Sequence, residues 1–151
     1  MITYELEKLT DELIEEITPI LEDHRVELQS YKDMALNPNW EKYRQIEAAG
    51  DFRFLIARDE DNTIVGYAAF VMFYNMHYND YKMAIEDVFY VVQDKRGSRI
   101  AINLVKKSEA ILKELGVHVI THHAKFTNTF AEFLEKLGYH KTETMLAKRI
   151  N

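Results

Sequence analysis

One helical segment lies between two strand-like runs, and this order constrains the fold more than any other feature. The runs 83–92, MAIEDVFYVV, and 117–124, VHVITHHA, are rich in the β-branched and aromatic residues that favour strands. Between them, small or apolar residues recur every three or four positions, as in an amphipathic helix: Ile100, Ala101, Leu104, Val105, Ser108, Ile111, Leu112 and Leu115. A helix joining two β-rich runs requires at least one parallel crossover, so we predict a mixed α/β fold.

Two helices are expected before these strands. The segment 10–28 has apolar residues at helical spacing after Thr10, and Pro19 predicts that it is kinked or divided. A second, shorter helix follows, with Asn39 as its N-cap and Gly50 at its end.

Strands are expected on both sides of the helical segments. The runs 52–59 and 63–74 predict a β-hairpin, because turn residues separate two stretches of strand-forming residues. After the crossover, 127–139 predicts a short helix and 143–150, ETMLAKRI, a last strand. One more strand is expected over 2–7.

Composition narrows the class of protein. The 151 residues are 47% hydrophobic and 29% charged, which is ordinary for one globular domain spanning 1–151. The absence of cysteine excludes disulfides and thiolate nucleophiles. No apolar run approaches the roughly 20 residues that span a bilayer, and the acidic start is unlike a targeting peptide. We therefore expect a cytoplasmic protein that does not bind membranes.

The charge argues against a nucleic-acid partner. The net charge is −6, whereas nucleic-acid binding needs a basic patch. Residues 1–60 hold 15 acidic and 7 basic residues, and residues 61–151 hold 10 and 12. Acidic residues on the solvent-facing sides of the early helices explain this difference in charge. The alternative is that the second part meets an anionic ligand and the first a cationic one.

The turn QDKRGSRIA, 93–101, has the features of an anion site. A strand, a turn and a helix start direct free backbone N–H groups and the positive end of the helix dipole toward one place. Lys95, Arg96 and Arg99 surround Gly97 with positive charge. An ordinary basic helix start explains these residues equally well.

This turn and two further segments resemble the GNAT superfamily of N-acetyltransferases. Arg96-Gly97-Ser98-Arg99-Ile100-Ala101 is similar to the family's Arg/Gln-x-x-Gly-x-Gly/Ala loop. TNTFAEFLEKLGY resembles its later helix, and NTIVGYAAF resembles its hairpin before the cofactor strand. The resemblance is greatest to small phage-encoded members. It implies a mostly antiparallel twisted sheet with a central parallel splayed pair, flanked by about four helices.

The resemblance implies acetyl-coenzyme A (acetyl-CoA) as the cofactor. The family's loop cradles the pyrophosphate, and a backbone N–H late in the preceding strand polarises the thioester carbonyl. The implied cofactor residues are Tyr90, Val91, Val92, Arg96, Gly97, Ser98, Arg99, Ile100, Ala101 and Asn128. Arg99 stands where the family usually has glycine, so the loop works only if Arg99 takes an ordinary helical conformation.

The family often has a catalytic carboxylate on this strand, at the place of Glu86 and Asp87. Adjacent strand residues point to opposite faces, so only one of them enters the cleft. We expect Asp87, because alternation places it on the face of Phe89 and Val91. Two solvent-exposed charges are the competing interpretation.

The family's tyrosine general acid is missing, because Leu134 occupies its position. Tyr78, Tyr81, His77 and the histidines of 117–124 are the replacements that the sequence leaves open, and we include Tyr78 and His123 in the predicted catalytic set. On a strand, His118 and His122 lie about 13 Å apart, too far to share a metal ion, so no metal is expected.

The run FYNMHYNDY, 73–81, gathers aromatic residues at a strand end and its loop. This loop rims the acceptor pocket in the family, and aromatic rings attract a charged amine. The predicted acceptor residues are His24, Tyr74, His77, Tyr78 and Tyr81. Ordinary sheet packing, and a surface position for His24, are the competing interpretations.

Three functions fit these observations. The first is an acetyl-CoA-dependent N-acetyltransferase that acts on a small-molecule or peptide amine by direct attack; the resemblance allows a homodimer, and the sequence leaves the oligomeric state open. The second is a catalytically weak or inactive module that binds coenzyme A (CoA) or a partner protein. The third is an acidic interaction protein. A shared fold alone does not choose among them.

Overall fold

Five strands form one sheet in the order in which they occur along the chain. The computed structural model describes all 151 residues. Its strands are β1 (Thr3–Leu6), β2 (Phe52–Arg58), β3 (Ile64–Tyr74), β4 (Lys82–Val91) and β5 (Val117–Thr121). β1 to β4 pair antiparallel, and β5 is parallel to β4. The predicted crossover and mixed α/β class are confirmed.

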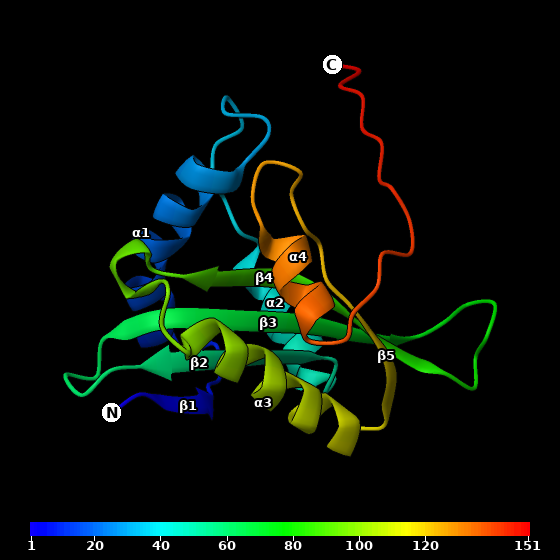
Figure 1. Cartoon of the computed structure of the whole chain (residues 1–151), viewed down its shortest axis with the longest axis horizontal. Helices are drawn as coiled ribbons and strands as arrows, with labels where there is room; N and C mark the ends of the chain where they lie inside the picture. Colours follow the sequence, from blue (N-terminus) through cyan, green and yellow to red (C-terminus); the bar gives the residue numbers. More distant parts are fainter.

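Four helices cover the two faces of this sheet (Figure 1). α1 (Asp11–Leu28) and α2 (Trp40–Ala48) pack on one face, and α3 (Ile100–Glu114) and α4 (Phe130–Lys136) on the other. Each face has its own buried cluster: Leu104 of α3 packs in the cluster of Phe70, and Ile17 of α1 in that of Phe54. The face to which a strand residue points therefore decides its surroundings.

Local sequence signals set the helix ends. Thr10 and Asn39 accept hydrogen bonds from first-turn amides of α1 and α2 at 3.2 and 3.0 Å. Gly50 and Gly116 follow α2 and α3 with φ of +85° and +78°. α1 runs through Pro19 as one helix, so the expected division is not found. None of the helices combines the length and apolar character needed to cross a membrane.

The end of the chain differs from the prediction. No strand forms over 143–150, and this segment extends past α4, away from the sheet (Figure 1). Met145 and Leu146 are 74% and 89% exposed. An extended segment becomes a strand only by pairing with a neighbour, and this one has none. β5 is therefore an edge strand, and the parallel pair lies at the margin of the sheet rather than at its centre.

Candidate active site

The sheet opens between β4 and β5. The two strands pair only from Lys82 and Val117 to Ile85 and Thr121. Beyond this point β4 continues to Val91 beside β3 alone, while the chain after β5 leads to α4. The second half of β4 therefore has an unpaired backbone edge. We call the place where this edge and the chain after β5 separate the split.

One amide of β4 points into the split. The Val92 N–H donates to the Val65 carbonyl of β3 at 3.1 Å. The Val91 carbonyl instead accepts from Arg96 Nε at 2.9 Å. The N–H and C=O of a strand residue point the same way, and neighbouring residues point in opposite directions. Of the three predicted amides, Val91 thus faces the split, and Tyr90 and Val92 face β3.

The loop after β4 has the backbone of a helix-start anion site. A short 3-10 helix, Gln93–Lys95, leads to Gly97 with φ of +77°, and α3 begins at Ile100. Arg99 has φ −79° and ψ 3°, which any L residue adopts. The positive φ therefore falls at Gly97, and arginine is tolerated where the family has glycine. A Cβ added at Gly97 would meet nothing within 4 Å, so the space beside the loop is open.

Arg96 is bound to α1. Its two terminal nitrogens donate to the Glu27 carboxylate at 2.6 and 2.8 Å, and its guanidinium lies 5.2 Å from the centroid of the Tyr90 ring. Gln93 and the Tyr90 hydroxyl also donate to Glu27. The hydrogen bond from Arg96, helped by that from Gln93, lowers the pKa of Glu27 to about 2. Glu27 is therefore the partner of the loop, and no sequence pattern marks it, because 69 residues separate it from Arg96.

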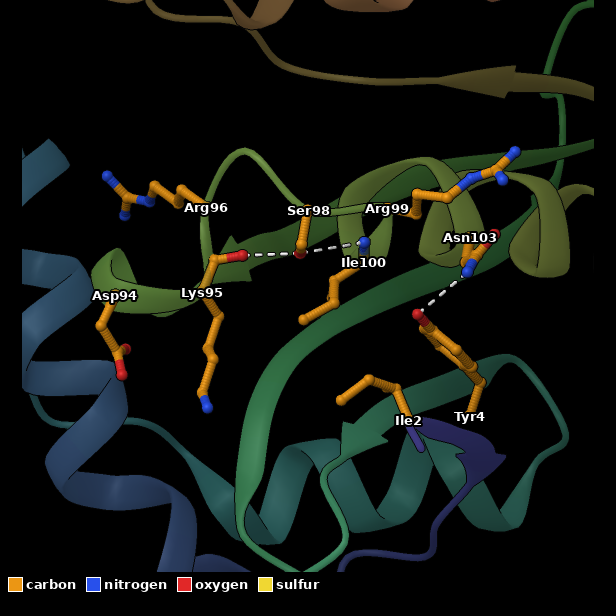
Figure 2. A pocket seen from close by; sticks show the side chains of 9 residues that line it. All are labelled: Ile2, Tyr4, Asp94, Lys95, Arg96, Ser98, Arg99, Ile100 and Asn103. Atoms are coloured by element: carbon orange, nitrogen blue, oxygen red, sulfur yellow. Dashed lines mark hydrogen bonds between the residues drawn. The ribbon is translucent and has the colours of Figure 1, made fainter.

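A hollow of about 440 Å³ lies beside the loop, between the start of α3 and β1. Figure 2 shows Lys95 at its border, Asn103 bonded to the Tyr4 hydroxyl, and Arg96 pointing away from it toward α1. Lys95 and Arg99 line the hollow and form no ion pair. The hollow thus has positive charge at the helix start, but none of its lining residues comes from β4 or β5.

A β-bulge in β4 separates the two predicted carboxylates. The register with β3 shifts between Ala69 and Phe70, so that Glu86 pairs and Asp87 is the extra residue. Glu86 points to the face of α3 and α4, and Asp87 to the face of α1 and α2. The predicted opposite orientation is therefore present. The placement of Asp87 on the face of Phe89 is wrong, because the bulge reverses the alternation beyond it.

Asp87 lies on an exposed part of the sheet beside α2. Its carboxylate accepts a hydrogen bond from the Tyr43 hydroxyl at 2.8 Å. Partial loss of hydration raises the pKa of Asp87, against the opposing effects of the Tyr43 hydrogen bond and the nearby His123. The structure thus brings together the predicted Asp87 and His123, and adds Tyr43, which no sequence motif singled out.

Glu86 forms a buried pair with the neighbouring histidine. His122 Nδ1 is hydrogen-bonded to the Glu86 carboxylate, and the two side chains are 2% and 7% exposed. Four aromatic rings stand nearly perpendicular to the imidazole, with centroids 5.0 to 6.2 Å away: Phe70, Phe89, Phe130 and Tyr139. Phe130 also packs on Phe89 at 4.9 Å, so an aromatic contact spans the split.

Most predicted acceptor residues lie far from Asp87. Four of them belong to the end of the β3–β4 hairpin: Tyr74, His77, Tyr78 and Tyr81. Asp87 follows the start of β4 at Lys82 by about 16 Å of strand. Tyr78, also a catalytic candidate, is 67% exposed at this hairpin and is not brought beside Asp87.

His24 lies under β4 instead. Its Nδ1 is 2.9 Å from the Tyr67 hydroxyl, and its ring stacks on Tyr90 at 4.6 Å. Burial lowers the pKa of His24 to about 4, although the charge of Glu27 opposes this shift. His24 and the hairpin residues therefore do not form one pocket.

The remaining predicted residues occupy helix starts or the core. Ile100 and Ala101 form the first turn of α3, and Ile100 is buried. Asn128 precedes the N-cap Thr129 of α4 and accepts a hydrogen bond from the Phe130 N–H at 3.1 Å. Leu134 is buried in α4, which leaves no hydroxyl at the position of the family's tyrosine.

Solved structures share this fold over nearly the whole chain. Ribosomal-protein-alanine N-acetyltransferase from Brucella melitensis is 18% identical, with a TM-score of 0.74 over 100% of both chains. Glucosamine-6-phosphate N-acetyltransferase from Arabidopsis thaliana is 15% identical, with a TM-score of 0.74 over 99% of both chains. A predicted acetyltransferase with acetyl-CoA from Clostridium acetobutylicum is 17% identical, with a TM-score of 0.75 over 99% of this chain and 96% of that one. At these identities the likeness establishes the fold alone.

The sequence itself matches a family. A comparison with curated protein sequences finds no match. The model of the acetyltransferase (GNAT) family, however, matches residues 11–139, from the start of α1 to the residue after Gly138. This range contains the split, the loop before α3 and both carboxylates. The chain therefore belongs to the GNAT acetyltransferase family.

Proposed function

We propose that this protein transfers the acetyl group of acetyl-CoA to a primary amine by direct attack of the amine on the thioester. Acetyl transfer follows from the family; the acceptor type and the mechanism are our assignment. The observation that carries it is the split beside Asp87. There the Val91 N–H points to the open edge of β4, and an exposed carboxylate stands on the same strand.

The chain has groups suited to hold the cofactor. The amides after Gly97 and the dipole of α3 attract a pyrophosphate. Lys95 and Arg99 supply cations that no carboxylate neutralises, and the space beside Gly97 is open. The Val91 N–H, at the loop end of the split, would donate a hydrogen bond to the pantetheine arm, since Asp87 lies about 13 Å further along β4. Bound acetyl-CoA supplies an activated acetyl group with a thiol as its leaving group.

Asp87 is our proposed base. An ammonium ion becomes a nucleophile only after it loses a proton. Asp87 is exposed, and its raised pKa makes it a better proton acceptor than an ordinary carboxylate. The Tyr43 hydroxyl orients the carboxylate, and His123 lies close enough to interact with its charge. The chain has no cysteine that could carry the acetyl group, in keeping with direct transfer.

A CoA-binding module without catalysis is the second candidate function. Phe130 packs on Phe89 across the split, so that a bound cofactor must displace this contact. Leu134 also leaves the family's tyrosine position without a proton donor. These two observations favour binding without rapid turnover.

Thermal shift with acetyl-CoA tests the cofactor site. Binding should stabilise the wild-type protein by about 2.7 kcal/mol at a hundredfold excess over Kd. Gly97→Val should remove most of this rise, because valine is strained at positive φ and would reshape the loop. Gly50→Val is the matched control, since Gly50 also combines positive φ with open space but lies after α2. An undiminished shift in Gly97→Val would show that the loop does not bind the cofactor.

Thiol release with a panel of primary amines separates the two candidate functions. Turnover by the wild-type protein is expected, with kcat about 100-fold lower in Asp87→Asn and an unchanged thermal shift with acetyl-CoA. Asp61→Asn, a change at another exposed aspartate, should behave as wild type. Binding without turnover of any amine would favour the module, and full turnover by Asp87→Asn would remove Asp87 as the base.

A further inference from the structure

His122 has a buried nitrogen without a partner. Its Nδ1 is bonded to Glu86, whereas its Nε2 is shielded from solvent and forms no hydrogen bond. Buried polar atoms are bonded in the large majority of cases, so an unbonded one requires an explanation. The other such atom is the hydroxyl oxygen of Ser108, within α3 and away from the split.

The position of His122 suggests what its partner is. Pairing of β5 with β4 ends at Thr121 and Ile85, and His122 and Glu86 are the next residue of each strand. Their hydrogen bond therefore joins the two chains at the closed end of the split. From there, β4 runs about 16 Å to Val91 and the loop, a distance comparable with an extended pantetheine arm. The thioester end of such an arm would reach His122.

The surroundings of His122 exclude water, and two of its four covering rings lie outside the sheet. Phe70 and Phe89 belong to the sheet, whereas Phe130 belongs to α4 and Tyr139 follows that seven-residue helix. A shift of α4 with Phe130 and Tyr139 would open the split and uncover the imidazole without breaking the sheet. In such a dry site a proton transfer from a fixed donor is more effective than in water.

The other groups near α4 do not offer a proton to this place. Leu134 replaces the family's tyrosine, and Tyr78 lies in the distant hairpin. Burial and the nearby Glu109 carboxylate raise the pKa of Tyr139, so its hydroxyl is a poor acid. His122 is the titratable ring that remains at the closed end of the split.

We propose that His122 is the general acid of the reaction, an inference that rests on the proposed function. As the amine nitrogen bonds to the acetyl carbon, the C–S bond breaks and its electron pair stays on sulfur. His122, held in place by Glu86, donates its Nε2 proton to that sulfur and later regains a proton from water. Two protons leave the ammonium nitrogen by way of Asp87, so the net products are one amide, one thiol and one released proton.

His122→Asn tests this role, because asparagine can keep the bond to Glu86 but has no equivalent of Nε2. We expect kcat with acetyl-CoA and an accepted amine to fall about 30-fold or more, while the Kd of CoA, measured by calorimetry, stays within about threefold. His118→Asn is the control, since His118 lies on the same strand but accepts from the Lys82 N–H at 3.1 Å at the far end. It should retain wild-type turnover.

Several outcomes overturn the inference. A kcat of His122→Asn within about threefold of wild type does so, and so do equal losses of kcat and CoA affinity, which a packing role predicts. If His122→Asn does not fold, Glu86→Gln replaces it: we expect lower kcat with unchanged CoA affinity, and unchanged kcat overturns the role. A wild-type protein that binds CoA but acetylates no amine would instead contradict the proposed function itself.

Discussion

Glu86 and Asp87 are consecutive on β4, but their surroundings are opposite. The Glu86 side chain is 7% exposed and bonded to His122 among aromatic rings. Asp87 is exposed, and its one hydrogen bond is to Tyr43 on α2. A buried charge is tolerated only when it is paired, whereas an exposed carboxylate is free to exchange protons with water. The bulge thus places Glu86, the partner of the proposed acid His122, on the dry face of β4 and the proposed base Asp87 on its open face.

The two faces also differ in what their polar contacts connect. On the α4 face, the bond between Glu86 and His122 joins two neighbouring strands. On the α1 face, Glu27 binds Arg96 of the loop before α3, and His24 is hydrogen-bonded to Tyr67 of β3. Loss of the first contact should therefore weaken the core, and loss of the others should loosen α1 from the loop and the sheet.

The largest effect on stability is expected at the buried pair. Glu86→Leu leaves His122 without a partner, and should lower the free energy of unfolding by about 3 kcal/mol in urea denaturation. Asp87→Asn on the open face should cost less than about 1 kcal/mol. The double change Glu86→Leu, His122→Phe should recover most of the loss, because no buried polar group is left. If Glu86→Leu and Asp87→Asn lower the free energy of unfolding equally, the two faces of β4 do not differ as described.

A smaller effect, visible only in acid, is expected on the α1 face. Burial lowers the pKa of His24 from 6.5 to about 4, so the folded protein holds this ring neutral while the unfolded chain protonates it. Its stabilisation is complete above pH 6.5 and is lost as the pH falls toward 4. Between pH 7 and 4.5, the wild type should lose about 2 kcal/mol more than His24→Gln in urea titrations.

His140→Gln is the control for this titration, because His140 is exposed. It should keep the pH dependence of the wild type. If the free energy of unfolding of His24→Gln depends on pH as that of the wild type does, another group causes the acid sensitivity. The burial of His24 would then not distinguish the α1 face from the α4 face.

The elements that sequence predicts well are those encoded within a few residues. Thr10 and Asn39 cap helices through neighbours three positions away, and the apolar stripe of α3 repeats within one helix. The strand expected over 143–150 fails because strand formation depends on a partner elsewhere in the chain. Pattern alone cannot supply that partner.

The candidate site follows the same rule. The loop at Gly97 was predictable from residues 93–101, and the opposite orientation of Glu86 and Asp87 from strand alternation. The face of each carboxylate was not, because it depends on a register shift against β3. Contacts such as Tyr43 with Asp87 join residues 44 positions apart, and no local signal records them.

The smallest effect is expected at the ion pair between α1 and the loop. Arg96 lowers the pKa of Glu27 from 4.5 to about 2, so this pair stabilises the fold above pH 4.5 and loses its effect as the pH falls toward 2. The Arg96 side chain is 40% exposed, so solvent screening reduces the contribution to about 1 kcal/mol. Glu27→Gln should therefore be less stable than the wild type by that amount at pH 7, by less than half of it at pH 3, and by less again in 1 M salt. A stability difference that persists at pH 3 and in salt would mean that Glu27 acts through packing. The contrast between a buried contact on the α4 face and a solvent-screened ion pair on the α1 face would then be wrong.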